Sequence, residues 1–311
     1  MGRKVIDIPE LGLFLAWLLV MAILGLSTPN FLTPGNMVNI MRDSSILLIV
    51  SAGMTIALIS GGLDLSVAAV MAIAGVVMGW TYSQGVPMPV ALLAGIATGP
   101  AIGALNGQLI TRARINPLIA TLGIMGVCRG LAFIWTDGRT IPIHDAAFRF
   151  ARAQPLGIPL PIFFMIAVLI VIYYLLGHTK FGQHLYAMGG NADAARQAAL
   201  NVGHHRRLVY ILSASLAALA GVVWASVQGL QDPRAATGRE LDVATAVLLG
   251  GATLSGGGGS IQGTLIAVLF ITSILNGLVG QGIDPEWQYV IRGGLLLVAV
   301  ILGEARKGGY R

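Results

Sequence analysis

The chain has 311 residues, of which 56% are hydrophobic and only 10% are charged, and its mean hydropathy is +0.81. Soluble domains carry about 25% charged residues, so the composition excludes a water-soluble globule and indicates one all-α integral membrane domain over residues 1–311. The net charge of +6 fits Lys and Arg gathered at the cytoplasmic ends of helices, and nucleic acid is not an expected partner. The single cysteine, Cys128, excludes an internal disulfide.

Ten apolar segments are expected to lie in the bilayer, whose core needs about 20 helical residues. In chain order they are Leu11–Leu26, Met37–Ile59, Leu65–Tyr82, Met88–Ile110, Pro117–Trp135, Pro161–Leu176, Leu208–Gln228, Val243–Leu254, Ile261–Gly280 and Trp287–Leu302. The first has no small-residue cleavage site after it and is expected to be a retained span rather than a signal peptide. The eighth is short enough to be a half-helix, and whether it fully spans stays open.

Four clusters of basic residues test this count. They are Arg3/Lys4, Arg112/Arg114, the Lys180–Arg207 loop and Arg306/Lys307/Arg311, which together hold 11 of the 19 Lys and Arg residues. Placing every cluster in the cytoplasm requires an even number of spans between neighbours, and the ten segments provide four, two and four. The positive-inside rule therefore predicts ten spans with both termini cytoplasmic.

Glycines recur every four residues in the fourth span, at Gly95, Gly99, Gly103 and Gly107, and Gly75/Gly79 and Gly126/Gly130 repeat the spacing. Four residues return a helix to nearly the same face. We therefore predict smooth strips against which neighbouring helices pack closely. A pore-lining role for part of the strip is the alternative.

The sequence has no pattern typical of an enzyme. It lacks HExxH, paired-carboxylate and GxSxG motifs, and "SGGGGSIQGT" lacks the Lys and the spacing of a phosphate-binding loop. We therefore expect no catalytic residue, no cofactor and no metal site in this chain. The glycine-rich segment is expected to form a tight turn between two spans.

Four polar residues at the expected membrane depth are candidates for a translocation path: Asp64, Asn106, Arg129 and Asn276. Each is costly in lipid unless it has a partner or faces water. Asp64 is also placed to cap the third span. Arg129 could snorkel, pair with an acid on another helix or line an aqueous path, and either Asn could bond between helices. The four form no ion-binding cluster, which disfavours an ion-coupled secondary transporter.

The polar stretch "LYAMGGNADAARQAALNVGHHRR" (185–207) separates two strongly apolar segments. Asn191 is a typical N-cap and "ADAARQAAL" favours helix, which predicts a helix of roughly ten residues, about 15 Å long. We expect a bend at Gly189–Gly190 and a stop at Asn201. Because the helix surface is mainly alanine, it is either an interfacial connector or a dock for another protein's groove.

Several motifs in the chain resemble those of one family. "GGLDLSVAAVMAIAG", "INPLIATLGIMGVCRGLAFIWTDGRTI", "FGQHLYAMGGNADAARQAALNV" and "GRELDVATAVLLGGATLSGGGGSIQGTLI" resemble, in order, blocks of the membrane permeases of ribose/monosaccharide-class bacterial ABC importers. The resemblance covers about residues 36 to 300. The chain departs from the family pattern at two places: Ala68–Ala69 replaces Gly-Ser, and Ala199 replaces a Gly. These changes affect only the expected local bends of the backbone.

The resemblance implies a vitamin-B12-type (type II) permease in the bacterial inner membrane, translocating a monosaccharide delivered by a periplasmic binding protein. A second permease subunit, identical or paralogous, and a cytoplasmic ATPase that binds ATP and Mg would complete the importer. Residues 178–207 would form the cytoplasmic coupling loop. By resemblance, its ATPase-coupling residues are Gly189, Gly190, Asn191, Ala195 and Arg196.

Five arginines in expected outer loops, Arg139, Arg149, Arg152, Arg234 and Arg239, are candidates for docking the binding protein. Solvated or intraloop pairing is the alternative, because acidic residues accompany them. The transported solute also stays open: a nucleoside, a furanosyl signal molecule or an amino acid is the alternative to a sugar. A self-sufficient secondary transporter is the rival from another class.

Overall fold

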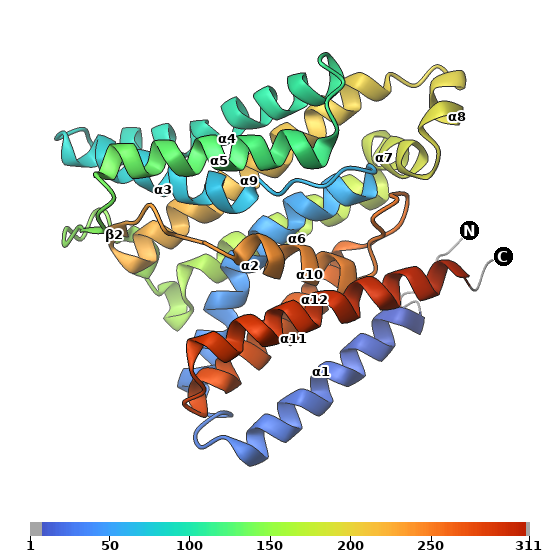
Figure 1. Cartoon of the computed structure of the whole chain (residues 1–311). Helices are drawn as coiled ribbons and strands as arrows, with labels where there is room; N and C mark the ends of the chain where they lie inside the picture. Colours follow the sequence, from blue (N-terminus) through green and yellow to red (C-terminus); the bar gives the residue numbers. More distant parts are fainter. Residues whose placement is uncertain (1–7, 309–311) are drawn as a thin grey trace.

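The computed structural model of the chain describes residues 8–308 and is a bundle of α-helices (Figure 1). Its helices are α1 (Ile8–Ser27), α2 (Pro34–Ile59), α3 (Val67–Ser83), α4 (Met88–Thr111), α5 (Pro117–Thr136), α6 (Leu160–His178), α7 (Lys180–Gly190), α8 (Ala192–Gln197), α9 (Val202–Gln228), α10 (Arg239–Leu249), α11 (Ile261–Gly280) and α12 (Pro285–Gly308). Single 3-10 turns cover Phe150–Arg152 and Pro155–Gly157. One antiparallel pair of two-residue strands, β1 (Ile141–Pro142) and β2 (Leu230–Gln231), interrupts the all-helical pattern.

Seven helices in the described part of the chain are long and apolar enough to cross a membrane: α1, α2, α4, α5, α6, α9 and α11. The other three predicted spans coincide with α3, α10 and α12, which have 17, 11 and 24 residues. At about 1.5 Å per residue, α10 is about 16 Å long, roughly half of the hydrocarbon core of ~30 Å. Arg3, Lys4 and Arg311, which entered the charge argument, lie outside the described residues.

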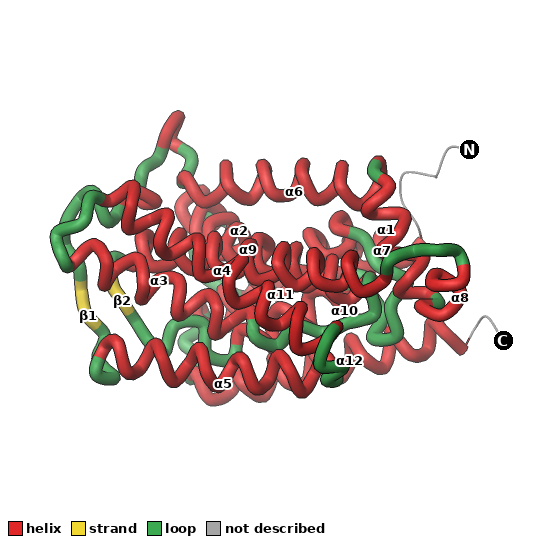
Figure 2. The backbone as a smooth tube through the Cα atoms, turned by 90° about the horizontal axis from the view of Figure 1, so that it is seen from above, coloured by secondary structure: helices red, strands yellow, loops and turns green. Residues whose placement is uncertain are grey.

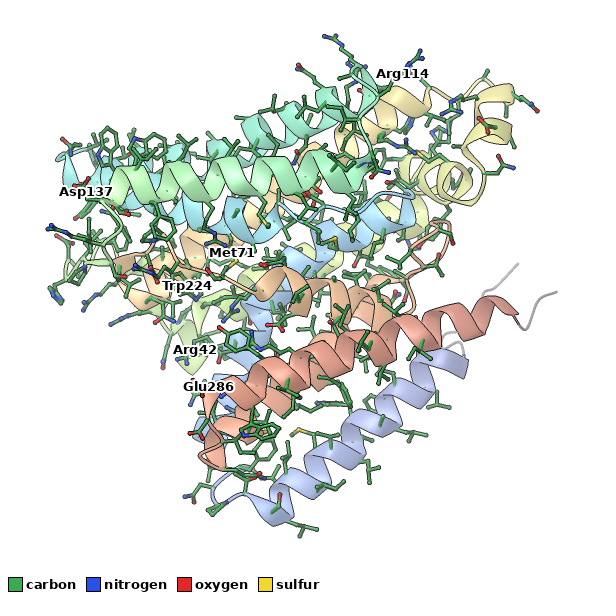
Figure 3. All side chains as sticks on the ribbon, viewed as in Figure 1. Arg42, Met71, Arg114, Asp137, Trp224 and Glu286 are labelled. Carbon is green, nitrogen blue, oxygen red and sulfur yellow. The ribbon has the colours of Figure 1, made fainter. Side chains whose placement is uncertain are left out.

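The bundle has two ends. At one, here called the strand end, β1 pairs with β2; at the other, the α7 end, α7 and α8 form a cap beyond the long helices (Figures 1 and 2). Helix α1 begins and α12 ends on the α7 side (Figure 1). With side chains drawn, Arg114 lies toward the α7 end and Asp137 at the strand end (Figure 3).

The core is built on α4 and α9, which pack antiparallel along the α4 glycine strip. A Cβ on Gly99 would lie 2.6 Å from the carbonyl oxygen of Ala214, and one on Gly103 would lie 2.4 Å from that of Tyr210. Gly95 and Gly107 lie against the same helix, at Val222 and Arg207. The two backbones therefore approach more closely than any side chain on this strip would allow.

The strip on α5 differs from its prediction. A Cβ on Gly126 or Gly130 would meet no atom within 4 Å in the described structure. These glycines repeat the spacing of α4 but lie on an outward face of α5, where Val127, Leu131 and Ile134 are exposed. The spacing predicts that they share one face, and no helix among residues 8–308 covers that face.

Candidate functional site

The α7 end is organised by helix α7, which turns sharply out of α6. Thr179 caps α7, its hydroxyl accepting a hydrogen bond from the backbone N–H of Gly182 at 3.2 Å. A Cβ on Gly182 would lie 2.2 Å from the carbonyl oxygen of Leu176, so only glycine fits inside this elbow. The hydroxyl of Tyr186 donates to the carbonyl oxygen of Gly259 at 2.9 Å, which ties α7 to the turn between α10 and α11.

Three chain segments meet backbone to backbone at a glycine junction, formed by Gly61, Gly189, Gly190, Gly256 and Gly257. A Cβ on Gly189 would lie only 1.8 Å from the carbonyl oxygen of Ile59, the last residue of α2. That oxygen accepts a hydrogen bond from the N–H of Gly257 at 2.9 Å. Gly256 and Gly257 have φ of +85° and +76°, a region that glycine adopts without strain. The end of α7 is thereby held against both α2 and the α10–α11 turn.

Helix α8 is shorter than predicted. It covers six residues, Ala192–Gln197, because Ala199 takes a left-handed φ of +61° that ends the helix. Asn191 caps it as predicted, its side-chain oxygen accepting from the N–H groups of Asp193 and Ala194 at 3.0 and 2.9 Å. Asn201 does not stop this helix but caps α9, accepting from the N–H of His204 at 3.0 Å.

The predicted bend at Gly189–Gly190 is also misplaced. Both glycines are the last residues of α7, and the chain turns at Asn191, where φ is −154° and ψ is 101°. Gly189 and Ala195 are buried, whereas Gly190, Asn191 and Arg196 are exposed. The segment thus has one side attached to the bundle and one side open, where Arg196 forms an ion pair with Asp193.

Asp64 lies in a non-helical stretch, residues 60–66, between α2 and α3. Its carboxylate accepts hydrogen bonds from the N–H and the hydroxyl of Ser66 at 3.1 and 2.5 Å, and from the hydroxyl of Ser213 at 2.8 Å. The amide of Asn106 donates to the Ser66 hydroxyl at 3.0 Å. The predicted backbone hydrogen bond is present, but α3 begins at Val67 with Ser66 as its N-cap, so Asp64 closes the turn just before the helix. Asp64 and Asn106 are fully buried and fasten this stretch to α4 and α9.

Arg129 fastens a second non-helical stretch, residues 232–238, which leads into α10. Its guanidinium donates to the carbonyl oxygens of Pro233 and Ala235 at 3.0 and 2.7 Å. These two backbone carbonyls were not among the predicted partners, and Arg129 forms no ion pair with an acidic side chain of the described residues. At membrane depth such carbonyls need internal partners, and Arg129 supplies them.

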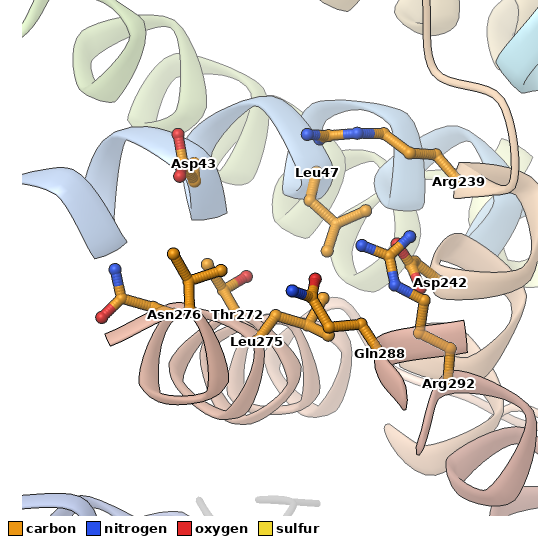
Figure 4. Close-up of a pocket in the computed structure, with 10 residues that line it drawn as sticks. Asp43, Leu47, Arg239, Asp242, Thr272, Leu275, Asn276, Gln288 and Arg292 are labelled. Carbon is orange, nitrogen blue, oxygen red and sulfur yellow. The ribbon is translucent and has the colours of Figure 1, made fainter. Parts of the chain in front are cut away.

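A polar cavity of about 220 Å³ lies between α2, α10, α11 and α12 (Figure 4). Four charged side chains line it: Asp43, Arg239, Asp242 and Arg292. Arg292 and Asp242 form an ion pair with an N–O distance of 3.0 Å, their side chains 23% and 5% exposed.

Of the four path candidates, Asn276 lines this cavity, and Asp64, Asn106 and Arg129 do not. Asn276 exchanges two hydrogen bonds with Asn36, at 2.9 and 3.1 Å, which join α11 to α2. Asp43, Gln288 and Arg292 were not among the predicted site residues. The available signal was a charged residue within or next to a predicted span, as with Arg292 in α12.

The five outer arginines do not form one surface. Three donate to backbone carbonyls at the strand end, with N–O distances of 2.6–3.1 Å: Arg149 to Ile143, Arg152 to Val227 and Gln228, and Arg234 to Gly138. Arg139 is exposed. Arg239 was misassigned to an outer loop, because it is the first residue of α10 and lines the cavity.

Comparisons with known proteins identify the family. Residues 36–300 match the family described as the permease component of the branched-chain amino acid transport system. This chain belongs to that permease family. It is 36% identical to the ribose import permease protein of Escherichia coli K12, over 94% of this chain and 93% of that protein. The corresponding ribose permease of Bacillus subtilis is 38% identical, over 94% and 92%.

An L-arabinose ABC transporter permease protein of Azospirillum brasilense is 36% identical, over 96% of this chain and 89% of that protein. The resemblance in the sequence motifs is therefore confirmed. Family membership and the seven long apolar helices of the described residues together identify the chain as a multi-pass permease of the inner membrane.

Proposed function

We propose that this chain is the translocation subunit of an ATP-driven, binding-protein-dependent importer for a monosaccharide. The observation that carries the proposal is the structure of the α7 end. There an exposed segment with small residues is held by direct backbone contacts against α2 and the α10–α11 turn. Relatives named for ribose, L-arabinose and D-allose import favour a sugar over an amino acid as the solute. The chain itself supplies neither ATP nor Mg sites in this scheme; a partner ATPase binds both.

In the proposed topology the chain passes the bilayer ten times, in a vitamin-B12-type arrangement, with both termini and the α7 end in the cytoplasm. The eighth passage is made by α10 together with the non-helical residues on either side. The run from β2 to Gly257 supports this, because it leads from the strand end to the glycine junction. Residues 178–207 are the cytoplasmic coupling loop.

Coupling follows from the attachment of α7. A groove of the ATPase would bind the exposed side of α7 and α8 at Gly190, Asn191 and Arg196. Because Gly189 contacts the end of α2 without intervening side chains, a movement of α7 is passed to α2 and to the α10–α11 turn. These helices are coupled in addition to α6 and α9, which flank the loop in sequence. A second permease subunit, identical or paralogous, would complete the path.

The strand end would face the periplasm and receive the binding protein. Arg139 is the best-placed docking residue because it is exposed. The guanidinium groups of Arg149, Arg152 and Arg234 have further N–H donors besides those that bond the backbone. Docking through such exposed charges weakens with salt. A docking affinity that salt and an Arg139→Glu change leave unaltered would remove this part of the proposal.

The test is sugar uptake into vesicles that contain the chain, its permease partner and the ATPase, with loaded binding protein outside. Uptake should require all components and ATP. Gly190→Glu and Arg196→Glu should uncouple ATP hydrolysis from uptake while the bundle stays folded, because position 190 opens onto free space. Gly35→Glu, in the exposed first turn of α2 and away from the α7 end, is a control for an added charge, since a Cβ there also meets no atom within 4 Å. Uptake by the chain alone would identify a secondary transporter and overturn the proposal.

A further inference from the structure

The cavity between α2, α10, α11 and α12 has a mouth and a floor. Asp43 and Val279 are exposed and mark the mouth, whereas Asp242 and Thr272 are 4% and 7% exposed and form the floor. All four lie in the half of their helices nearer the turn that joins α11 to α12. The cavity is therefore an indentation that opens at the surface near the α11–α12 turn and ends at buried polar groups.

Polar groups in the cavity wall lack partners. In residues 8–308, the hydroxyl of Thr272 and the Nε of Arg292 are buried and make no hydrogen bond. Buried donors and acceptors are nearly always paired, because leaving one unpaired costs its full desolvation. A helical Thr normally satisfies its hydroxyl by donating to the carbonyl four residues back, as Thr245 does to Leu241 at 2.6 Å. The hydroxyl of Thr272 lines the cavity and is therefore free to bond a ligand there.

The charges of the cavity indicate the class of that ligand. Two carboxylates, of Asp43 and Asp242, balance two guanidinium groups, of Arg239 and Arg292, so neither an anion nor a cation is favoured. Carboxylates only accept hydrogen bonds and guanidinium groups only donate them. A neutral molecule whose hydroxyl groups do both fits this mixture.

The remaining lining completes the fit. Gln288 and Asn276 add amide donors and acceptors, while Leu47 and Leu275 provide apolar wall for the C–H faces of a ring. The volume of about 220 Å³ is below the ~300–1,000 Å³ typical of drug-sized ligands. The space suits one small ring.

We propose that this cavity binds one neutral monosaccharide during its passage through the permease. The site rests on the proposed function and names the groups that recognise the solute: the Asp242–Arg292 pair, Thr272 and Gln288. Binding is expected to be weak, because a transported solute must also leave.

Saturation-transfer difference NMR on the full chain in nanodiscs tests binding directly, with D-ribose, L-arabinose and D-allose as probes. Thr272→Val keeps the shape of the side chain and removes the hydroxyl, and it should lower the sugar signal about fivefold, the effect of one hydrogen bond. Thr245→Val is the matched control, since Thr245 is equally buried but bonded within its own helix. Gln288→Leu, nearer the mouth, provides a second variant should Thr272→Val fold poorly.

Equal sugar signals in wild type, Thr272→Val and Gln288→Leu would overturn the proposal. So would displacement of the sugar by L-leucine or by a sugar phosphate, because the cavity would then favour a ligand with ionised groups over a polyhydroxylated one. Signal lost equally in Thr245→Val would also overturn it, because the effect would then be a general one of packing.

Uptake by the complete importer separates this proposal from the proposed function. With saturating loaded binding protein, Thr272→Val should lower sugar transported per ATP about fivefold and leave the ATPase rate unchanged. Unchanged transport per ATP would count against the cavity while leaving the importer assignment standing. ATP-independent uptake in wild type would reject the importer assignment, and the NMR result would still decide whether the cavity binds sugar.

Discussion

Replacing Gly189 by alanine tests the glycine junction at its tightest point. The new methyl carbon would lie 1.8 Å from the carbonyl oxygen of Ile59, whereas real Cβ contacts are not shorter than 3.0 Å. The end of α7 must therefore move away from α2 by at least about 1.2 Å, the difference between the two distances. The N–H of Gly257, which donates to the same oxygen, lies 2.5 Å from the methyl carbon and is displaced as well.

The cost has two parts. Overpacking of a close contact costs about 1–3 kcal/mol, and an unpaired buried N–H costs about 1–3 kcal/mol more. Gly190→Ala is the matched control, because its methyl group meets no atom within 4 Å. Both changes gain the same helix propensity of alanine over glycine, about 1 kcal/mol, so their difference isolates the junction. We expect Gly189→Ala to be less stable than Gly190→Ala by about 2–5 kcal/mol.

Thermal unfolding of the two variants in the same detergent or nanodisc measures this difference. Vesicles with the ATPase then measure coupling, and Gly189→Ala should hydrolyse ATP with reduced uptake. If Gly189→Ala melts at or above the temperature of Gly190→Ala and transports normally, α7 and α2 are not in direct backbone contact.

Two further changes test other parts of the bundle. Gly103→Ala should destabilise the α4–α9 contact by about 1–3 kcal/mol, since its Cβ would lie 2.4 Å from the Tyr210 carbonyl oxygen; Gly123→Ala, which meets no atom, should not. Equal melting temperatures would contradict the packing described. Ala199→Gly should stabilise the chain by about 0.5–1 kcal/mol, because glycine removes the left-handed strain at φ +61°. A lower melting temperature for this variant would show that Ala199 is not strained.

How far the sequence predicts the structure differs between elements. The four-residue glycine period on α4 and α5 identifies a common face in each helix, but of these two strips the α4 strip alone has a partner within the described residues. The period is a property of one helix, whereas the partner depends on how distant segments pack. The helix after Asn191 was predicted too long for a local reason. Alanine favours helix at every position, and no residue of "AAL" indicates the left-handed conformation of Ala199. The family's glycine at this position was the available signal.

The cavity was largely hidden from the sequence for a similar reason. Its lining comes from α2, α10, α11 and α12, so Asp43 and Arg292 are almost 250 positions apart in the chain. Asp64 was singled out as polar at the expected membrane depth, but its distant partner Ser213 became visible only when α9 was placed beside it. Residue type predicts a need for partners, and only the packing decides whether protein or solute provides them.

Helix α10 also has a consequence for how the protein is made. Arg239, Glu240 and Asp242 lie in its first turn, and a charged residue at the centre of an inserting helix costs about 2.5–3.5 kcal/mol. A segment of 11 residues with three such charges does not partition into lipid by itself. Residues 230–260 therefore reach their place after α2, α9 and α11 have formed a protein-lined slot, and a ribosome-bound chain truncated before α11 should leave this segment in water.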